Sequence, residues 1–484
     1  MLPHAQPKLL RKKMSTVDTA WLRMDSEGNL MMIVGVAMLH KAVSVAALKR
    51  ALQARLLVYS RFRSRVVNDL GGAWWQEQEV DLDDHVVHTE LAGQRDHAAS
   101  KAALQALVGK LSQQRLDPAK PLWQMHLVDH CVGADGKMRQ ALIIRIHHCI
   151  ADGVALVGVF MSMFDKSAQA AGYQPSPGMA EAAEENPWEQ IMLPVTAASI
   201  KAIELSLGMM VKSMDLMSGL DKLPAQLASL GHTAGQLLAD AIALSTMDED
   251  SHTRLKGKPN GRKHVCWSEP MALAEVKAIG KAFGCSVNDV LMASVAGALR
   301  AYLRAKGDAV AEDCHVRVMV PVNLRKAGGQ QKLGNAFGLV PLVLPVGMED
   351  PVARLHEVRR RMNELKGSYT ALVAMSVLGV LGATPKQVQT EIQNYFARKA
   401  TAVMSNVPGP QAPLYLAGSA LEQCMFWVPQ SGDIGIGISI LSYNGGVQFG
   451  IVTDDALVRD PGHIIDRFAP EFEKLVLTAL MADW

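Results

Sequence analysis

The sequence has little of several features that mark common classes of protein. Aromatic residues make up only 5% of its 484 residues, and 49 Lys and Arg residues are almost balanced by 47 Asp and Glu residues. A protein that binds nucleic acid by displacing counterions needs a clear excess of basic residues, so we expect no nucleic-acid partner. With 49% hydrophobic and 20% charged residues, the composition is that of a globular chain and excludes a disordered one.

Cysteine is scarce and scattered. The chain has 6 cysteines and no C-x-x-C pair, so neither a disulfide framework nor a zinc site is indicated, and we expect reduced cysteines in a cytoplasmic protein. The basic residues 1–13 lack the apolar stretch of a signal peptide. The most informative uncharged stretch, 367–385, is diluted by Gly, Ser and Thr, so we expect no typical transmembrane helix.

The sequence also lacks the motifs of three large enzyme classes. It contains no G-x-S-x-G nucleophile elbow, no P-loop and no G-x-G-x-x-G segment. The hydrolases, kinases and dinucleotide-binding enzymes that use these motifs are therefore not indicated.

Hydrophobic periodicity divides the chain into two α/β halves. Residues 14–168 mix strands with helices, among them an apolar helix at 154–164 that we expect to be buried on every side. Residues 169–263 hold a linker rich in Pro, Gly and Glu, then Ala-, Leu- and Met-rich segments that predict a helical crossover. The α/β pattern returns at 264–484, where Asn444-Gly445 predicts a β-hairpin turn. We therefore predict an α/β fold of two halves joined by helices.

The sharpest motif is HHCIADG at 147–153, an HHxxxDG pattern placed where an apolar strand ends and a helix begins. Adjacent strand residues point to opposite faces, so we expect one of His147 and His148 to face a channel and the other to pack behind it. Imidazole has a pKa near neutrality and suits a general base, a role that we assign to His148. We expect Asp152 to cap the helix or pair with an arginine, and Gly153 to let a ligand approach the backbone.

This motif has three other interpretations. The two histidines can form a purely structural strand end. His148 and Asp152 have the spacing of metal ligands, but no third ligand follows at a suitable distance, so we predict no metal. Cys149 is small and apolar enough to pack in the core, which argues against a nucleophile.

Further motifs follow HHxxxDG or precede it in a fixed order. They are PLW at 121–123, SVNDV at 286–290, GNAF at 334–337, SNVPGP at 405–410, and SYN at 442–444 with the later Asp454. HHxxxDG is the pattern of the CoA-dependent acyltransferase superfamily. The ordered set resembles one branch, the bacterial bifunctional wax ester synthase/acyl-CoA:diacylglycerol acyltransferases, from residue 14 to about 475. The resemblance implies two chloramphenicol-acetyltransferase-like halves with mixed sheets.

The matched motifs extend the candidate site. We expect substrate contacts from Trp123, Ser405, Asn406 and Gly153, structural roles for Pro121 and Asp289, and an oxyanion contact from the side-chain amide of Asn288. Each motif also has a structural alternative. Trp123 can fill the core, Asn288 can be a helix N-cap, and Ser405-Asn406 can be a turn.

The implied activity is O-acyl transfer from acyl-CoA. His148 deprotonates a long-chain fatty alcohol or the free hydroxyl of diacylglycerol, which attacks the thioester directly and yields a wax ester or triacylglycerol. Acyl-CoA is a substrate, and we expect no metal or redox cofactor. The alternatives are a condensation-type acyltransferase that uses carrier-bound acyl groups, and a catalytically silent lipid-binding protein.

Two departures from the family pattern bear on the substrates. The family usually has Met-His-Val-Gly in its first strand, where this chain reads MIVG at 32–35. Residues 1–13 form a basic extension, in which two leucines stand beside four basic residues (Lys8, Leu9, Leu10, Arg11, Lys12, Lys13). Because the substrates are nearly insoluble, we expect this extension to attach the protein peripherally to the inner face of the plasma membrane or to lipid inclusions.

The apolar stretch 371–383 contains Gly379 and Gly382. Small residues within an apolar helix leave space, so this stretch is either part of an acyl or alkyl channel or a site of close helix packing.

Overall fold

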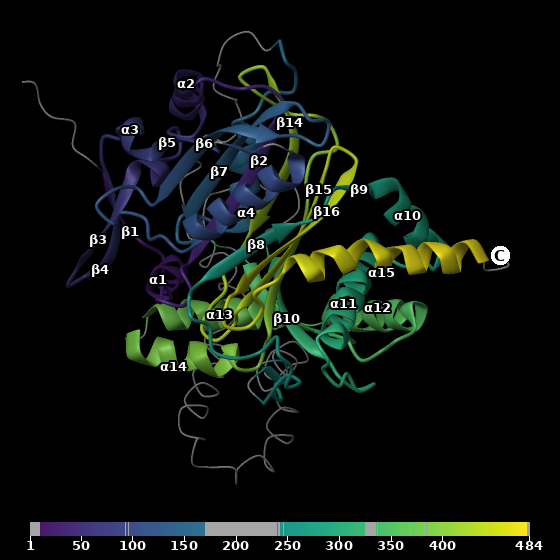
Figure 1. Cartoon of the computed structure of the whole chain (residues 1–484). Helices are drawn as coiled ribbons and strands as arrows, with labels where there is room; N and C mark the ends of the chain where they lie inside the picture. Colours follow the sequence, from purple (N-terminus) through teal and green to yellow (C-terminus); the bar gives the residue numbers. More distant parts are fainter. Residues whose placement is uncertain are drawn as a thin grey trace, which may run out of the picture.

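The computed structural model describes residues 10–481, apart from 92, 95, 170–239, 241, 242, 245, 325–334, 336, 367, 369, 384 and 385. Within these residues the chain forms three sheets, with helices against their faces (Figure 1). Most of the predicted crossover lies in the stretch 170–239, outside the described residues.

A six-stranded sheet forms the centre of the N-terminal half, in the order β13-β14-β2-β7-β6-β5. The strands that this half supplies are β2 (Met32–Leu39), β5 (Val86–Glu90), β6 (Trp123–Val132) and β7 (Met138–His147). Its helices are α1 (Thr16–Arg23), α2 (Val45–Arg55), α3 (Leu82–His85), α4 (His97–Ser112) and α5 (Gly153–Ser162). β7 is the apolar strand that the sequence predicts before HHxxxDG; it pairs antiparallel with β2 and β6, so the motif begins at the end of a central strand.

A small three-stranded sheet stands at the side of this half. Its order is β1-β4-β3, and its strands are β1 (Arg11–Lys13), β3 (Ser64–Asp69) and β4 (Gly72–Glu77). The end of the basic N-terminal extension is therefore an edge strand of a folded sheet, whereas Lys8 and Leu9 lie outside the described residues.

The C-terminal half has a mixed sheet in the order β11-β10-β12-β15-β16-β8, with β9 also paired to β16. Its strands are β8 (Lys263–Trp267), β9 (Met271–Ala272), β10 (Val316–Asn323), β11 (Phe337–Leu344), β12 (Ala402–Pro408), β15 (Ile436–Tyr443) and β16 (Gly446–Asp454). The predicted turn at Asn444-Gly445 is confirmed, because both residues have positive φ angles, 46° and 79°, and join β15 to β16.

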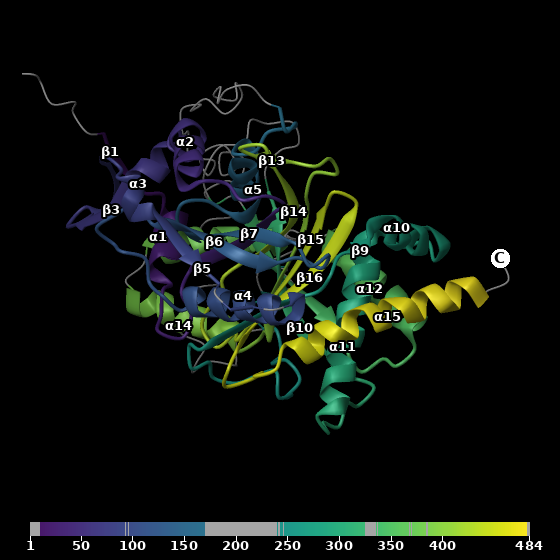
Figure 2. The same ribbon diagram turned by 45° about the horizontal axis from the view of Figure 1, so that its top comes forward.

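Four helices pack together beside this sheet (Figure 2). They are α10 (Leu273–Ala282), α11 (Val287–Ala305), α12 (Pro351–Lys366) and α15 (Gly462–Met481). Among the described residues no single helix is long and apolar enough to span a membrane; only α10 and α11 taken together, with a bend of 98° between them, reach that length and apolarity.

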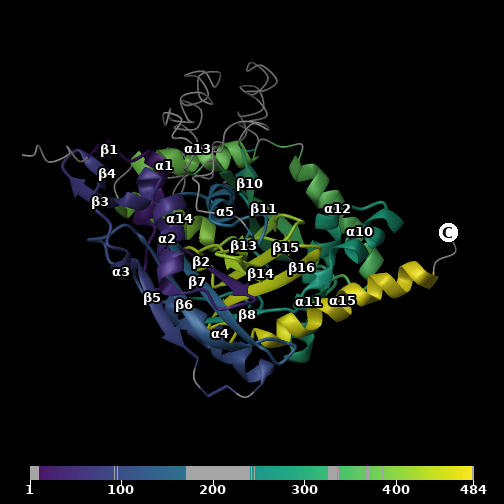
Figure 3. The same cartoon turned by 90° about the horizontal axis from the view of Figure 1, so that it is seen from above.

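The two halves are joined by strand exchange. β13 (Tyr415–Leu416) and β14 (Ser419–Trp427) belong to the C-terminal half of the sequence but complete the N-terminal sheet. β14 runs antiparallel to β2, from the pair Val34 and Trp427 to the pair Leu39 and Leu421. Figure 3 shows β14 between the strands of the two halves. A backbone ladder therefore crosses the boundary between them.

The apolar stretch 371–383 forms α13 (Thr370–Ala383), which packs against α1 and β11 and is followed by α14 (Lys386–Ala397). A Cβ atom on Gly382 would lie 1.7 Å from the carbonyl oxygen of Thr16, and one on Gly338 would lie 1.8 Å from that of Ala371. Only glycine permits these contacts. Of the two interpretations of this stretch, the structure favours close helix packing.

Candidate active site

The HHxxxDG motif forms the connection between β7 and α5. His147 is the last residue of β7, and Gly153 is the first residue of α5. The carboxylate of Asp152 accepts a hydrogen bond from the amide of Ala155 at 2.9 Å, which confirms the predicted N-cap. Both histidines and Asp152 are buried, so the connection is a fixed part of the interior.

The imidazole of His148 lies in an aromatic environment. Trp21 of α1 stacks on it, with ring centroids 4.2 Å apart and planes inclined by 24°, and Phe337 of β11 lies 5.5 Å away. Burial lowers the pKa of His148 to about 4, against an opposing effect of Asp152. At neutral pH the imidazole is therefore uncharged and able to accept a proton.

A hydrogen-bond network holds the backbone that carries His148. Asn335 donates from Nδ2 to the carbonyl oxygen of His148 at 3.0 Å and to Asp18 at 2.8 Å. Arg61 pairs with Asp18 at 2.9 Å and donates to the carbonyl oxygen of Ile150 at 2.7 Å. Because all of these groups are buried, this network fixes the position of the imidazole.

Three polar atoms at this place remain without a partner in the described part of the chain. They are Nε1 of Trp21, Nδ1 of His148 and Oδ1 of Asn335, and all three are buried. Buried polar atoms in native proteins nearly always form hydrogen bonds, and exceptions gather at functional sites. The surroundings of His148 can therefore accept further hydrogen bonds from a ligand.

His147 is anchored on the other side. The amide of Cys149 donates to its Nδ1 at 3.2 Å, and its Nε2 faces Asp25 at 3.5 Å. Asp25 in turn accepts from the amide of Met31 at 2.6 Å and pairs with Arg115 at 3.1 Å. Asp25, Arg115 and His147 line a cavity of about 790 Å³ between α1, β2, β3 and the segment 115–122, which we name the histidine-147 cavity.

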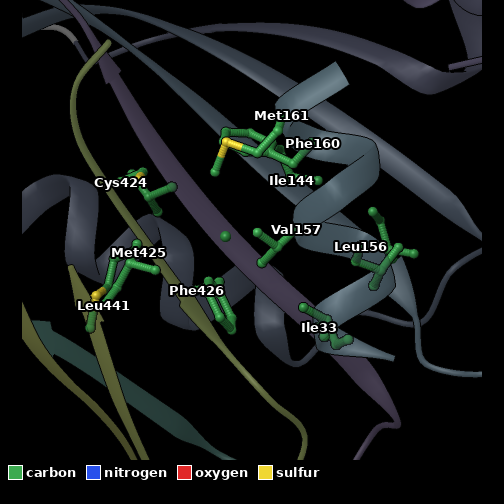
Figure 4. A pocket seen from close by; sticks show the side chains of 14 residues that line it. Ile33, Ile144, Leu156, Val157, Phe160, Met161, Cys424, Met425, Phe426 and Leu441 are labelled. Atoms are coloured by element: carbon green, nitrogen blue, oxygen red, sulfur yellow. The ribbon is translucent and has the colours of Figure 1, made fainter. Parts of the chain in front are cut away.

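A second cavity lies on the other face of the N-terminal sheet, and all of its lining residues are apolar or glycine (Figure 4). Its empty space, including the side that is open to solvent, is about 610 Å³. The residues come from β2, β7, α5, β14 and β15. Ile146 and Gly153, which flank the segment 147–152, both line it, so this apolar cavity begins beside the histidines. Since α5 lines it with Val157, Phe160 and Met161, that helix is only partly buried, and our prediction of burial on every side is wrong.

Two positions in this cavity bear on the substrate. A Cβ atom on Gly153 would meet nothing within 4 Å, so the backbone borders open space there, as expected for close approach of a ligand. Ile33, which stands where the family usually has histidine, also lines the cavity. The departure in the first strand therefore makes this cavity more apolar.

The residues predicted in the C-terminal half are brought together only in part. Asn406, at the end of β12, donates to the side-chain oxygen of exposed Asn288 at 3.0 Å. Asn288 is not the N-cap of α11, because Ser286 is, and Ser286 forms a capping box with Asp289. The Ser405 hydroxyl is buried between strands, 3.0 Å from that of Ser439. Among the described contacts, none joins Asn288 or Asn406 to His148.

The PLW element is part of the core. Trp123 is 1% exposed, donates from its indole to the carbonyl oxygen of Phe62 at 2.9 Å and stacks on His85. Pro121 accepts the amide of Trp123 at 2.8 Å in the turn before β6. Trp123 lines neither cavity described above. Its place in the core agrees with the structural alternative and gives no support to the predicted substrate contact.

Sequence reasoning did not identify Trp21, Asp18 or Asn335 as site residues. Trp21 is far from the motif in the chain, and only the fold brings α1 against it. The sequence did contain a signal for Asn335, because this residue lies in the GNAF segment that resembles the family pattern. Within the described residues, no three His, Cys, Asp or Glu side chains lie close enough together to hold a metal ion.

Comparisons with known proteins agree over almost the whole chain. A family model described as the wax ester synthase/diacylglycerol acyltransferase catalytic domain matches residues 14–291, and the corresponding C-terminal domain model matches 333–476. A Mycobacterium tuberculosis protein named as a diacylglycerol O-acyltransferase is 23% identical over 93% of both chains. A second one from Mycobacterium bovis is 27% identical over 84% of this chain and 77% of its own.

Solved structures share the fold. The wax ester synthase/diacylglycerol acyltransferase from Marinobacter aquaeolei superimposes with a TM-score of 0.67 at 20% identity, over 97% of this chain and all of that one. A starter condensation domain of rhizomide synthetase, solved with C8-CoA, gives a TM-score of 0.57 at 13% identity, over 98% of this chain and 95% of that one. The predicted fold of two acyltransferase-like halves is confirmed, and this chain belongs to the wax ester synthase/diacylglycerol acyltransferase family of acyltransferases.

Proposed function

We propose that this acyltransferase moves a fatty acyl group from acyl-CoA to the hydroxyl of a long-chain alcohol or of diacylglycerol, with His148 as the general base. One observation carries the proposal. An uncharged, buried imidazole stands beside a cavity that is lined only by apolar residues and glycine. The base can accept a proton while the cavity holds an apolar chain.

The reaction follows from this arrangement in two proton transfers. His148 takes the proton of the acceptor hydroxyl as its oxygen attacks the thioester carbon. The carbon–sulfur bond then breaks, and the protonated imidazole returns the proton to the leaving CoA thiolate. Because burial disfavours the charged imidazolium, this second transfer is favourable.

The acyl chain fits the apolar cavity. Its residues come from β2, β7 and α5 of one half and from β14 and β15 of the other, so both halves shape it. Each methylene group moved from water into such a cavity contributes about 0.8 kcal/mol. A long chain therefore supplies most of the binding energy, while the CoA moiety and the acceptor position the reacting atoms.

The oxyanion that forms on the thioester needs a hydrogen-bond donor. The hydrogen bond from Asn406 occupies the side-chain oxygen of Asn288 and turns the amide nitrogen of Asn288 away from Asn406. This orientation supports Asn288, in the SVNDV segment, as the hydrogen-bond donor to the oxyanion, with its side chain held in place by Asn406. No metal or redox cofactor takes part in the proposed steps.

The substrates also determine where the protein works. Long-chain alcohols and diacylglycerol reside in membranes and lipid inclusions, so we propose peripheral attachment at the inner face of the plasma membrane or on lipid inclusions, in the cytoplasm. The net charge of +2 is compatible with an anionic lipid surface.

One experiment separates the proposal from its alternatives. Purified protein is incubated with palmitoyl-CoA and hexadecanol, with palmitoyl-CoA and diacylglycerol, and with palmitoyl-CoA alone, while free thiol and lipid products are measured. We expect thiol release that depends on an acceptor, with an ester product. Transfer only from a carrier-bound acyl group would identify a condensation-type enzyme, and binding without any thiol release would identify a silent lipid-binding protein.

A further inference from the structure

The small sheet β1-β4-β3 has one face turned inward and one face turned outward. Residues paired across antiparallel strands point to the same side, and neighbours along a strand alternate. In β3, Val66 and Asn68 point inward and line the histidine-147 cavity. Val67 and Trp74 form a pair that points outward.

The outward face combines an aromatic ring with basic side chains. Lys13 pairs with Trp74, and Arg11 and Arg65 both stand opposite Gln76 on the same face. The Arg11 guanidinium lies 4.6 Å and the Lys13 ammonium 5.9 Å from the Trp74 ring centre. Asp69, which pairs with Arg11, is the acidic residue on this face, so the three basic residues leave it net positive.

Exposed leucines stand at both ends of this face. Leu70, in the turn between β3 and β4 that forms the tip of the sheet, is fully exposed. Leu10, just before β1, lies at the opposite end, where its carbonyl oxygen accepts the amide of Glu77, and is 71% exposed. A single exposed leucine is common in proteins, so what distinguishes these two is their place beside an aromatic and basic face. In Figures 1 and 2 the hairpin of β3 and β4 projects from the side of the molecule opposite the free end of α15.

We infer that the outer face and tip of this sheet are the surface by which the enzyme docks on an anionic lipid membrane. Tryptophan prefers the membrane–water interface, basic side chains attract anionic headgroups, and leucine enters the acyl region. The surface is placed for its task, because the cavity directly beneath β3 is lined by His147. The inference deepens the proposed function and rests on it, since a lipid acceptor is what makes docking useful.

Vesicle flotation tests the inference without any turnover. The full chain is mixed with vesicles of phosphatidylcholine alone or of phosphatidylcholine with added phosphatidylglycerol, which gives the vesicle a negative surface like that of a cytoplasmic leaflet. We expect binding to the anionic vesicles that weakens as salt is raised. Leu70→Glu and the pair Arg11→Gln with Lys13→Gln should each reduce binding, the pair by about fivefold for each basic residue removed.

Matched control variants change the same chemistry elsewhere. Leu480→Glu replaces a leucine that is 78% exposed at the end of α15, and Lys277→Gln with Lys281→Gln neutralises two exposed lysines of α10. These controls should bind vesicles like the unchanged protein. We call Leu70→Glu and the pair Arg11→Gln with Lys13→Gln the docking-surface variants. Equal losses of binding in the controls and in the docking-surface variants, full binding by the docking-surface variants, or no binding of the unchanged protein to anionic vesicles would each overturn the inference.

Activity assays separate this inference from the proposed function. The docking-surface variants should lose acyl transfer to diacylglycerol embedded in anionic vesicles, yet keep acyl transfer to a short alcohol dispersed in detergent. If all proteins, including the unchanged one, show no transfer in detergent, the proposed function fails while flotation still decides the docking surface. Because Leu70 lies in an exposed turn, the melting temperature of Leu70→Glu should stay unchanged.

Discussion

The indole of Trp21 lies almost parallel to the imidazole of His148, with their centroids 4.2 Å apart. This contact joins α1, near the start of the chain, to the end of β7. α13 packs against α1 through the contact at Gly382, so three segments remote in the sequence determine where the imidazole stands. Trp21 acts through His148, and we regard it as a positioning residue.

Replacing Trp21 by alanine should therefore reduce kcat/KM. A reacting group misplaced by about 1 Å loses up to about 10²-fold in rate. Trp21→Phe keeps a ring against the imidazole and should keep most of the activity. Steady-state kinetics at fixed palmitoyl-CoA measure both variants, and unchanged kinetics for Trp21→Ala would show that the stack has no part in positioning.

The two histidines should respond differently to removal. His148→Ala should lower ester formation by about 10²–10⁴-fold, the usual contribution of a general base. His147→Ala removes the contact with Asp25 and should act mainly through a lower melting temperature. Thermal unfolding measured beside turnover distinguishes these effects. Near-full turnover by a folded His148→Ala protein would contradict the mechanism.

The pH dependence follows from the buried imidazole. The pKa of His148 is lowered to about 4 by burial, so the base stays uncharged above that value and is protonated only as the pH falls through it. We expect kcat/KM to be level from about pH 8 to pH 6 and to fall by half near pH 4. In Trp21→Ala, solvent reaches the ring, and the half-maximal pH should rise towards 6.5, the ordinary value for histidine. A fall centred near 6.5 in the unchanged enzyme would indicate a solvated base.

Chain-length selectivity should depend on Gly153. A Cβ atom at this position meets nothing within 4 Å, so we expect Gly153→Leu to keep the fold and to occupy the start of the apolar cavity. We expect turnover with palmitoyl-CoA to fall far more than turnover with acetyl-CoA. Gly379→Leu is the matched control, because α13 lines neither cavity and the substitution should affect all chain lengths alike. Acyl-CoA substrates of increasing length provide the measurement.

The oxyanion role of Asn288 can be tested by charge. Asn288→Asp keeps the size of the side chain but replaces its donor with a carboxylate, so it should lower kcat more than Asn288→Ala, with little change in KM for the alcohol. Removing a single oxyanion donor typically costs about 10²–10³-fold in kcat. Asn406→Ala should give a smaller loss through misorientation, and equal activity of both Asn288 variants with the unchanged enzyme would exclude the role.

Local patterns predicted the local parts of this site. The end of β7, the cap by Asp152 and the hairpin turn at Asn444 each depend on a few adjacent residues, and each was confirmed. The histidine surroundings depend on α1 and β11, whose approach is a tertiary event with no periodic signal. For the same reason the sequence predicted Trp123 as a ligand contact within a family motif, although its hydrogen bond and ring stack place it in the core.

The ladder between β2 and β14 restricts how the protein can move. The backbone pairs from Val34 and Trp427 to Leu39 and Leu421 keep β14 on the N-terminal sheet, so any parting of the two sheets must bend the chain on either side of β14 and leaves its wall of the apolar cavity in place. We therefore expect a fatty chain to enter this cavity lengthwise, and release of the ester to slow as the chain grows longer.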